Sequence, residues 1–166
     1  MPPLVAAMIS LGVLGAIDTY ITATIFPVPV WVTFIAWASF FACGGGNQGL
    51  VKSIVSNWTG IGIASITLLI IQYGPAHPIF AAILVGAGTS AMILASAIPI
   101  LNFPPAIVFG FASLVGTSAA TDTTIVTSGL NHPTLVAMAA MLLGGVFGLL
   151  SEIGTQLLAG KKSATA

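Results

Sequence analysis

Three polar side chains, Asp18, Asn57 and Asn131, lie within or beside long apolar stretches of this sequence. An ionised carboxylate inside a membrane span costs at least ~2.5 kcal/mol, so Asp18 should face a partner or water rather than lipid. It could bind a solute or a proton, or it could lie near the membrane interface and hydrogen-bond to a neighbouring helix. Each asparagine offers one acceptor and two donors. The pair could therefore replace water around a small neutral solute, or could join helices to one another.

Six further residues complete the predicted solute path. His132 could act as a gate by titrating near neutral pH, or could be a solvated residue at a helix end. Trp37, with Trp31 and Phe41, could form a pore constriction, or could pack between helices or at the membrane interface. The remaining four are polar residues in or beside the short spans: Ser39, Asn47, Ser113 and Asp122.

Sequence motifs of catalysis are absent. The chain contains no HExxH, no Gly-x-Ser-x-Gly, no phosphate-binding Gly-Lys-Ser/Thr and no paired carboxylates at helical spacing. Haem and quinone sites usually need histidines or basic residues inside the spans, which this chain lacks. The single cysteine, Cys43, excludes a multi-thiolate metal site and an internal disulfide. We therefore expect no enzyme activity, no catalytic or metal-binding residues and no cofactor.

The elements that must position the polar residues are transmembrane helices. Only 4% of the chain is charged, against about a quarter in a typical soluble domain. Each helical span needs roughly 20 mostly apolar residues, so 166 residues accommodate six spans with short connections. We expect an all-α, polytopic protein that forms a single transmembrane domain over residues 1–166, with the lipid bilayer as its surroundings. A net charge near zero and no basic cluster argue against nucleic acid as a partner.

Proline, glycine and polar breaks set the expected ends of the six spans. Proline cannot continue a helix and restricts the residue before it. The glycine-rich segment 44–49 should be too flexible to remain helical without help, and the polar segment 117–124 resembles it in position. The expected spans are residues 4–25, 30–43, 53–73, 79–100, 106–116 and 134–158.

The two halves of the chain suggest an inverted repeat. At a shift of 74 residues, Ser39 aligns with Ser113 and Asn57 aligns with Asn131. Each half, 4–73 and 78–158, reads as a long span, a proline break, a short span, a polar segment and a third span. Three is an odd number, so the second copy would cross the membrane in the opposite direction. Such 3+3 inverted repeats recur in transporters and channels, and interrupted spans in matching positions point to the solute path.

The lysines indicate an orientation. With six spans both termini lie on one side, and so does the loop after the second span. Lys52, Lys161 and Lys162 would then all be cytoplasmic, as the positive-inside rule expects. Both termini are therefore predicted to be cytoplasmic, with Asp122 on the outer side.

Residues 30–61 resemble a known family. The aromatic-rich stretch from Trp37 and Ala38 to Gly46, followed by Gly49-Leu50 and Lys52, is similar to the core pattern of a family of small bacterial inner-membrane proteins of unknown function. The resemblance implies a small, glycine- and alanine-rich, six-helix protein of the bacterial inner membrane. It implies no substrate.

The near absence of fixed charge favours a channel or facilitator for a small, mostly uncharged solute, such as urea, ammonia, a short amide, water or carbon dioxide. A path for ions would normally show charged rings, and a proton-coupled carrier several buried titratable groups. The alternative is a non-conducting accessory or structural subunit of a larger membrane complex, which would carry the same small residues and equally little chemistry.

A small bundle with a small-residue surface should form a homo-oligomer. Gly144 and Gly148 form a small-xxx-small pair suited to close helix packing, within or between subunits. Closed cyclic symmetry is usual for homo-oligomers, and a trimer is the first expectation.

Overall fold

Residues 1–160 are described by the computed structural model, and they form helices rather than strands. Six α-helices and one short 3₁₀ helix follow one another along the chain. Their bounds are α1 Pro3–Thr24, α2 Val30–Ala42, α3 Gly46–Tyr73, α4 Pro78–Ala95, η1 Pro99–Leu101, α5 Pro104–Thr121 and α6 Pro133–Ala159.

Five of these helices, namely α1, α3, α4, α5 and α6, are long and apolar enough to cross a membrane. The prediction of an all-α, multi-pass membrane protein is therefore confirmed, and lipid must surround these helices. The second expected span is different. A crossing needs about 30 Å and a helix rises ~1.5 Å per residue, so α2, with 13 residues, reaches only about 20 Å.

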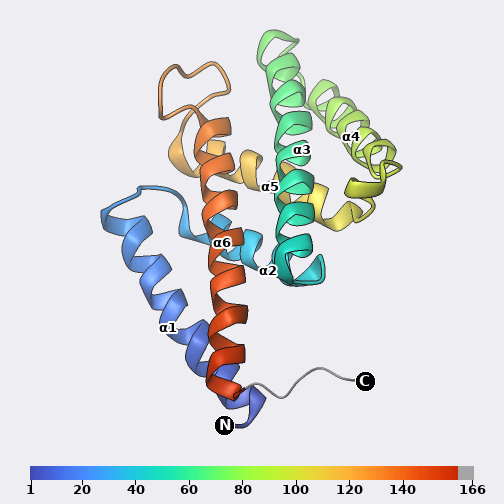
Figure 1. Cartoon of the computed structure of the whole chain (residues 1–166). Helices are drawn as coiled ribbons and strands as arrows, with labels where there is room; N and C mark the ends of the chain where they lie inside the picture. Colours follow the sequence, from blue (N-terminus) through green and yellow to red (C-terminus); the bar gives the residue numbers. More distant parts are fainter. Residues whose placement is uncertain (161–166) are drawn as a thin grey trace.

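The two longest helices, α3 and α6, pack against each other and run in opposite directions (Figure 1). α1 lies along α6 and α4 lies along α3, whereas the short α2 packs mainly on α6 and α5 mainly on α3. The N-terminal nitrogen of Met1 lies 3.4 Å from the carbonyl oxygens of Leu158 and Ala159. The start of α1 and the end of α6 therefore lie on the same side of the molecule, opposite the turn between α3 and α4.

The glycine-rich segment 44–49 is mostly helical, contrary to expectation. Only Cys43, Gly44 and Gly45 connect α2 to α3, and both glycines adopt positive φ, 103° and 69°. The N–H of Gly46 then donates to the Glu152 carboxylate of α6, at 2.7 Å. An acceptor from a distant helix thus satisfies a backbone donor that the start of a helix leaves free, so α3 begins before the expected residue 53.

The boundaries of the fourth and fifth spans also differ from expectation. α4 ends at Ala95, and residues 99–101 form the 3₁₀ helix rather than a continuation of α4. α5 continues to Thr121, five residues beyond the expected end, because the polar residues after 116 remain helical. It stops at Asp122, which adopts a left-handed φ of 51°.

Glycines let the helices meet backbone to backbone. A Cβ on Gly60 of α3 would collide with the carbonyl of Ile107 in α5, and one on Gly110 of α5 would collide with the backbone of Asn57. Close approach through small residues is the usual basis of helix association in membranes. The predicted cytoplasmic lysines 161 and 162 lie outside the described residues.

Candidate functional site

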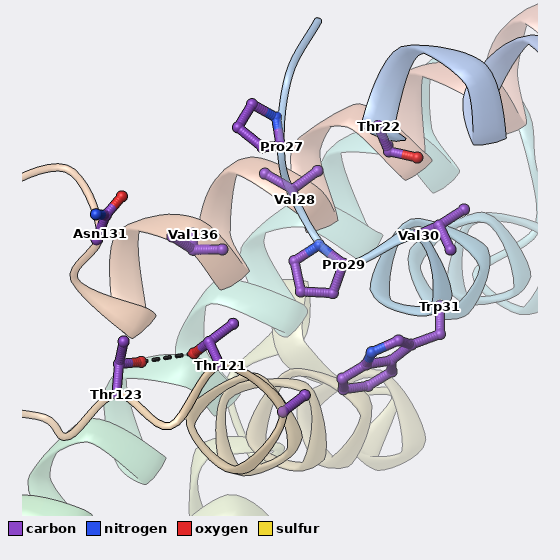
Figure 2. Close-up of a pocket in the computed structure, with 11 residues that line it drawn as sticks. Thr22, Pro27, Val28, Pro29, Val30, Trp31, Thr121, Thr123, Asn131 and Val136 are labelled. Carbon is purple, nitrogen blue, oxygen red and sulfur yellow. Dashed lines mark hydrogen bonds between the residues drawn. The ribbon is translucent and has the colours of Figure 1, made fainter. Parts of the chain in front are cut away.

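A surface cavity of about 580 Å³ lies where the α1–α2 connection meets the end of α5 and the start of α6 (Figure 2). One wall is the proline-rich connection with the first turn of α2, and the other is the polar end of α5 with the α5–α6 loop. Thr22 lines it from α1, and Asn131 and Val136 line it from the loop and from α6. No charged residue of the described chain lines the cavity. Its uncharged polar lining includes three threonines and one asparagine: Thr22, Thr121, Thr123 and Asn131.

Asp18 lies one helical turn before Thr22 in α1 and is completely buried. Its Oδ2 lies within hydrogen-bond distance of the hydroxyl of Thr33 in α2. The same hydroxyl lies 2.6 Å from the carbonyl oxygen of Val30. Oδ1 of Asp18 is buried and has no hydrogen-bond partner among the described residues. The carboxyl group therefore faces a neighbouring helix rather than lipid, and only one of its two oxygens has a hydrogen-bond partner among the described residues.

Asn57 belongs to a closed polar cluster between α2 and α3. The Ser39 hydroxyl donates to Asn57 Oδ1 at 3.1 Å, and the Ser53 hydroxyl donates to Ser39 Oγ at 2.8 Å. The Asn57 amide donates back to Ser53 Oγ at 3.3 Å. All three side chains are fully buried. The cluster joins the two helices, and one amide hydrogen of Asn57 remains outside it.

The structure does not bring Asn57 and Asn131 into equivalent places. Asn57 lies well inside α3, whereas Asn131 is an exposed residue of the loop that precedes α6. The aligned amide pair therefore does not form two ends of one path. Asn131 instead lines the cavity, and Asn57 lies in the interior.

Ser113 belongs to a set of buried hydroxyls without partners in the described part of the chain. Many of the other helix hydroxyls donate to a carbonyl three or four residues earlier, as Thr59 does to Val55 at 2.8 Å, and others donate to a neighbouring helix, as Ser10 does to Ser151. The buried hydroxyls without a partner among the described residues belong to α3 and α5: Ser56, Ser113, Thr117 and Ser118.

The α5 members of this set extend inward from the cavity. Thr121, which lines the cavity, follows Thr117 by four residues, and Thr117 follows Ser113 by four, so the three share one helix face. Gly110 lies on the same face and packs on the backbone of Asn57. A row of hydroxyls thus runs along α5 from the cavity toward the contact of Gly110 with the Asn57 backbone.

Trp37 does not line the cavity. Its Nε1 donates to Ser151 Oγ of α6 at 2.9 Å, and its buried ring lies between Phe34 and Phe147, with centroid distances of 5.7 and 6.0 Å. The Ser10 hydroxyl of α1 donates to the Ser151 carbonyl at 2.9 Å. These contacts join α1, α2 and α6, as the packing alternative expected.

The other predicted residues lie at helix ends. Asn47, in the first turn of α3, is exposed beside a separate groove that Lys52 also lines. Asp122 is exposed at the end of α5. His132 Nδ1 accepts the N–H of Thr134 at 3.2 Å and so caps α6. Within residues 1–160, no group of three or more His, Cys, Asp or Glu residues could hold a metal ion.

The threonines of the cavity and of α5 were not singled out in the sequence, and neither were Ser53 and Thr33. Ser53 precedes Asn57 by four residues, a helical spacing that could have identified it. Thr33 has no such local signal, because its partner Asp18 lies in a different helix.

Comparison with known proteins gives one match. Neither the curated proteins nor the solved structures contain a match to this chain. Residues 8–156 match the model of a family described as protein of unknown function, DUF1097. Because the match covers most of its length, this chain belongs to the DUF1097 family.

Proposed function

We propose that this protein is a facilitator for a small, uncharged polar solute, such as urea, ammonia, a short amide or water, with carbon dioxide as a further candidate. The observation that carries the proposal is the row of hydroxyls from Thr121 through Thr117 to Ser113, which leads from the cavity toward Asn57. A buried hydroxyl without a partner costs about 1–3 kcal/mol. A solute with its own donors and acceptors would recover that cost during passage.

The inner part of the path continues on α3. Asn57 and Ser53 lie one turn apart on a buried helix face, and Gly49, a further turn along, packs against the backbone of the α2–α3 turn. This face leads toward the start of α3, the end of that helix that lies nearer the N-terminus of the chain (Figure 1). The path we propose therefore passes from α5 to α3 where Gly110 contacts Asn57.

The charge of the interior fits a neutral solute. The described buried residues contain a single ionisable side chain, Asp18. Ion paths normally carry rings of charged side chains or of carbonyl groups. A solute that crosses without charge needs only hydrogen-bond replacement.

An inverted repeat would make the two ends of this path structurally related. Two close contacts between helices support such a repeat. Gly60 of α3 packs on the Ile107 carbonyl of α5, and Gly144 of α6 packs on the Thr33 carbonyl of α2. Ile107 follows Thr33 by 74 residues, but Gly144 follows Gly60 by 84. We propose a 3+3 repeat in which the third helices are offset by ten more residues than the sequence alignment assumed.

The membrane location, orientation and oligomeric state that we propose rest on the sequence. The protein would lie in the bacterial inner membrane with both termini in the cytoplasm, as Lys52 suggests. It would form a closed homo-oligomer, a trimer as first expectation. The cavity would then open to the outer side, because it lies at the end of α1 away from Met1 (Figure 1).

Solute flux into proteoliposomes tests the proposal. Stopped-flow measurement against urea, ammonia, formamide, water and carbon dioxide should find at least one solute above the background of empty liposomes. Thr117→Val and Ser113→Ala should lower that flux at least about tenfold each, equivalent to ~1.4 kcal/mol of barrier. Thr89→Val is the matched control, because Thr89 is an exposed threonine of α4 whose hydroxyl donates to Val85.

Flux at background for the whole panel would contradict the proposal, and so would unchanged flux in both α5 variants. Asn57→Leu extends the test to the inner cluster. If Asn57 only joins helices, its replacement lowers thermal stability and leaves the flux per folded protein unchanged. If it lines the path, flux falls in the protein that remains folded.

A second candidate is a non-conducting subunit of a larger membrane complex. The observation in its favour is α4, in which only Gly88 and Met92 are buried and which exposes Thr89 and Ser90 beside its apolar residues. Purification in mild detergent separates the two. A single copy held by another protein favours the subunit, and a symmetric homo-oligomer with solute flux favours the facilitator.

A further inference from the structure

We propose that Asp18 and Thr33 form a proton-binding site beside the cavity, in which the carboxyl group is a neutral acid that donates to the Thr33 hydroxyl. Thr33 in turn donates to the carbonyl of Val30. The site would make the cavity wall sensitive to protonation, and this effect on passage rests on the proposed function.

Hydrogen-bond counting carries the proposal. The Thr33 hydroxyl has one proton, yet two oxygens lie within hydrogen-bond distance of it: Oδ2 of Asp18 and the carbonyl oxygen of Val30, the latter at 2.6 Å. A carbonyl cannot donate, and an ionised carboxylate cannot donate either. Both short contacts are hydrogen bonds only if Asp18 supplies its own proton to Thr33.

The surroundings of Asp18 offer no compensating cation among the described residues. The helices that pack on α1 are α2 and α6. α2 has no titratable side chain, and no backbone N–H at its start donates to Asp18. On α6, Glu152 accepts from Gly46, and at its N-terminus His132 accepts from Thr134. An ionised Asp18 would remain an unpaired buried charge, with Oδ1 unbonded.

The cavity begins one helical turn from Asp18. Thr22 lines the cavity, and its hydroxyl donates to the backbone carbonyl oxygen of Asp18 at 2.8 Å. On release, the proton leaves Asp18 Oδ2 for water in the cavity. The Thr33 hydroxyl then rotates from Val30 to the new carboxylate, so no other bond changes.

Release would alter the cavity itself. Val30 and its neighbours Pro29 and Trp31 line the cavity wall. The hydrogen bond from Thr33 holds the carbonyl of Val30 in the first turn of α2. Losing this bond removes one of the contacts that hold that turn, and the Trp31 ring, which packs against Gly116 of α5, reports the change.

Infrared spectroscopy of the purified full chain tests the proton site without any solute. We expect a carboxylic acid C=O band at neutral pH that shifts in D₂O and disappears in Asp18→Asn. Asp122→Asn and Glu152→Gln are matched controls, because Asp122 is exposed and the Glu152 carboxylate accepts a hydrogen bond from the Gly46 N–H. Both controls should retain the band. Absence of the band from the wild type at neutral pH, or its persistence in Asp18→Asn, would overturn the proposal.

Thr33 variants and tryptophan fluorescence test the geometry. Thr33→Val should shift the C=O band toward that of a weakly bonded acid, and Thr33→Ser should restore it. In a Trp37→Phe, Trp58→Phe background, Trp31 emission should change over the pH range in which the band is lost. It should stay constant in the same background with Asp18→Asn. A constant Trp31 emission alongside a titrating band would overturn the link to the cavity.

These results separate the two proposals. An acid band in a protein with no flux supports the proton site and contradicts the facilitator. Flux through a protein that lacks the band does the reverse.

Discussion

The backbone carbonyl of Thr33 occupies the space that a Cβ on Gly144 would need. α6 therefore touches α2 directly behind the residue whose hydroxyl bonds to Asp18. A methyl group added at Gly144 should therefore displace the first turn of α2, beside the cavity.

Gly144→Ala should destabilise the protein by about 1–3 kcal/mol, because the added methyl group forces α6 away from α2. Gly62→Ala is the control, since an added Cβ there meets nothing within 4 Å. That variant should be neutral or gain up to about 1 kcal/mol from better helix propensity. Thermal unfolding in mild detergent measures both, and equal midpoints would contradict the close contact.

The Trp37–Ser151 hydrogen bond predicts an asymmetric pair of variants. Trp37→Phe removes a donor but leaves Ser151 Oγ bonded to the Gly148 carbonyl at 2.7 Å, so the lost hydrogen bond should cost about 0.5–1.5 kcal/mol, apart from the cavity that the smaller ring leaves. Ser151→Ala leaves a buried indole N–H without an acceptor and should cost more, about 1–3 kcal/mol. Thermal unfolding of the two variants and the double variant gives their coupling. A coupling energy near zero between the two variants would argue against the bond.

Glu152 should control the start of α3. Glu152→Ala removes the acceptor for the Gly46 N–H and should cost about 0.5–2 kcal/mol, as the loss of a helix cap does. Glu152→Gln keeps an acceptor and should cost less. Hydrogen exchange at residues 46–49 should increase in Glu152→Ala, whereas Gln156→Ala, an exposed neighbour, should leave it unchanged. Equal exchange in the two alanine variants would show that the carboxylate does not hold this turn.

The proposed orientation predicts which residues react with an impermeant thiol reagent. Cys43 is the single cysteine, so Cys43→Ala provides an unreactive background. In that background Thr121→Cys should be modified from the outer side. Ser163→Cys, which lies outside the described residues, should react only after the membrane is opened. Modification of Ser163→Cys in intact cells would reverse the orientation.

Sequence reasoning located helix ends well where proline marks them. The last span was expected from residue 134 and begins at Pro133, and the second was expected at 30–43 and is Val30–Ala42. Proline at the start of a helix needs no N–H partner, so its signal is local. Such a signal can be read from a short stretch of chain.

The ends that the sequence missed depend on distant partners or on burial. α3 starts early because Glu152, 106 residues away, accepts from Gly46, and no feature of 44–49 reveals that carboxylate. α5 continues through polar residues that resemble a loop, yet Ser113 and Thr117 are buried on one helix face. Spacing by four could have shown this face, whereas burial depends on the fold.

The sequence predicted which types of contact the site residues would make better than it predicted their partners and positions. Asp18 was expected to face a partner, and it does, but the identity of Thr33 follows only from how α1 and α2 pack. The match of Asn57 with Asn131 assumed a constant shift between the halves. The connection between α5 and α6, residues 122–132, is longer than the 43–45 turn, so a constant shift cannot hold beyond the second helices.

The meeting of Met1 with the last turn of α6 makes the folded chain nearly a closed ring. A short linker from Gly160 to Met1 would complete that ring, and the turn at Gly74 and Pro75, at the far side of the molecule, offers a place to open it. The circularly permuted chain would start with α4 and finish with α3 while keeping every contact between helices. Its first helix would have to enter the bilayer from the opposite face, so such a chain would separate what the fold requires from what membrane insertion requires.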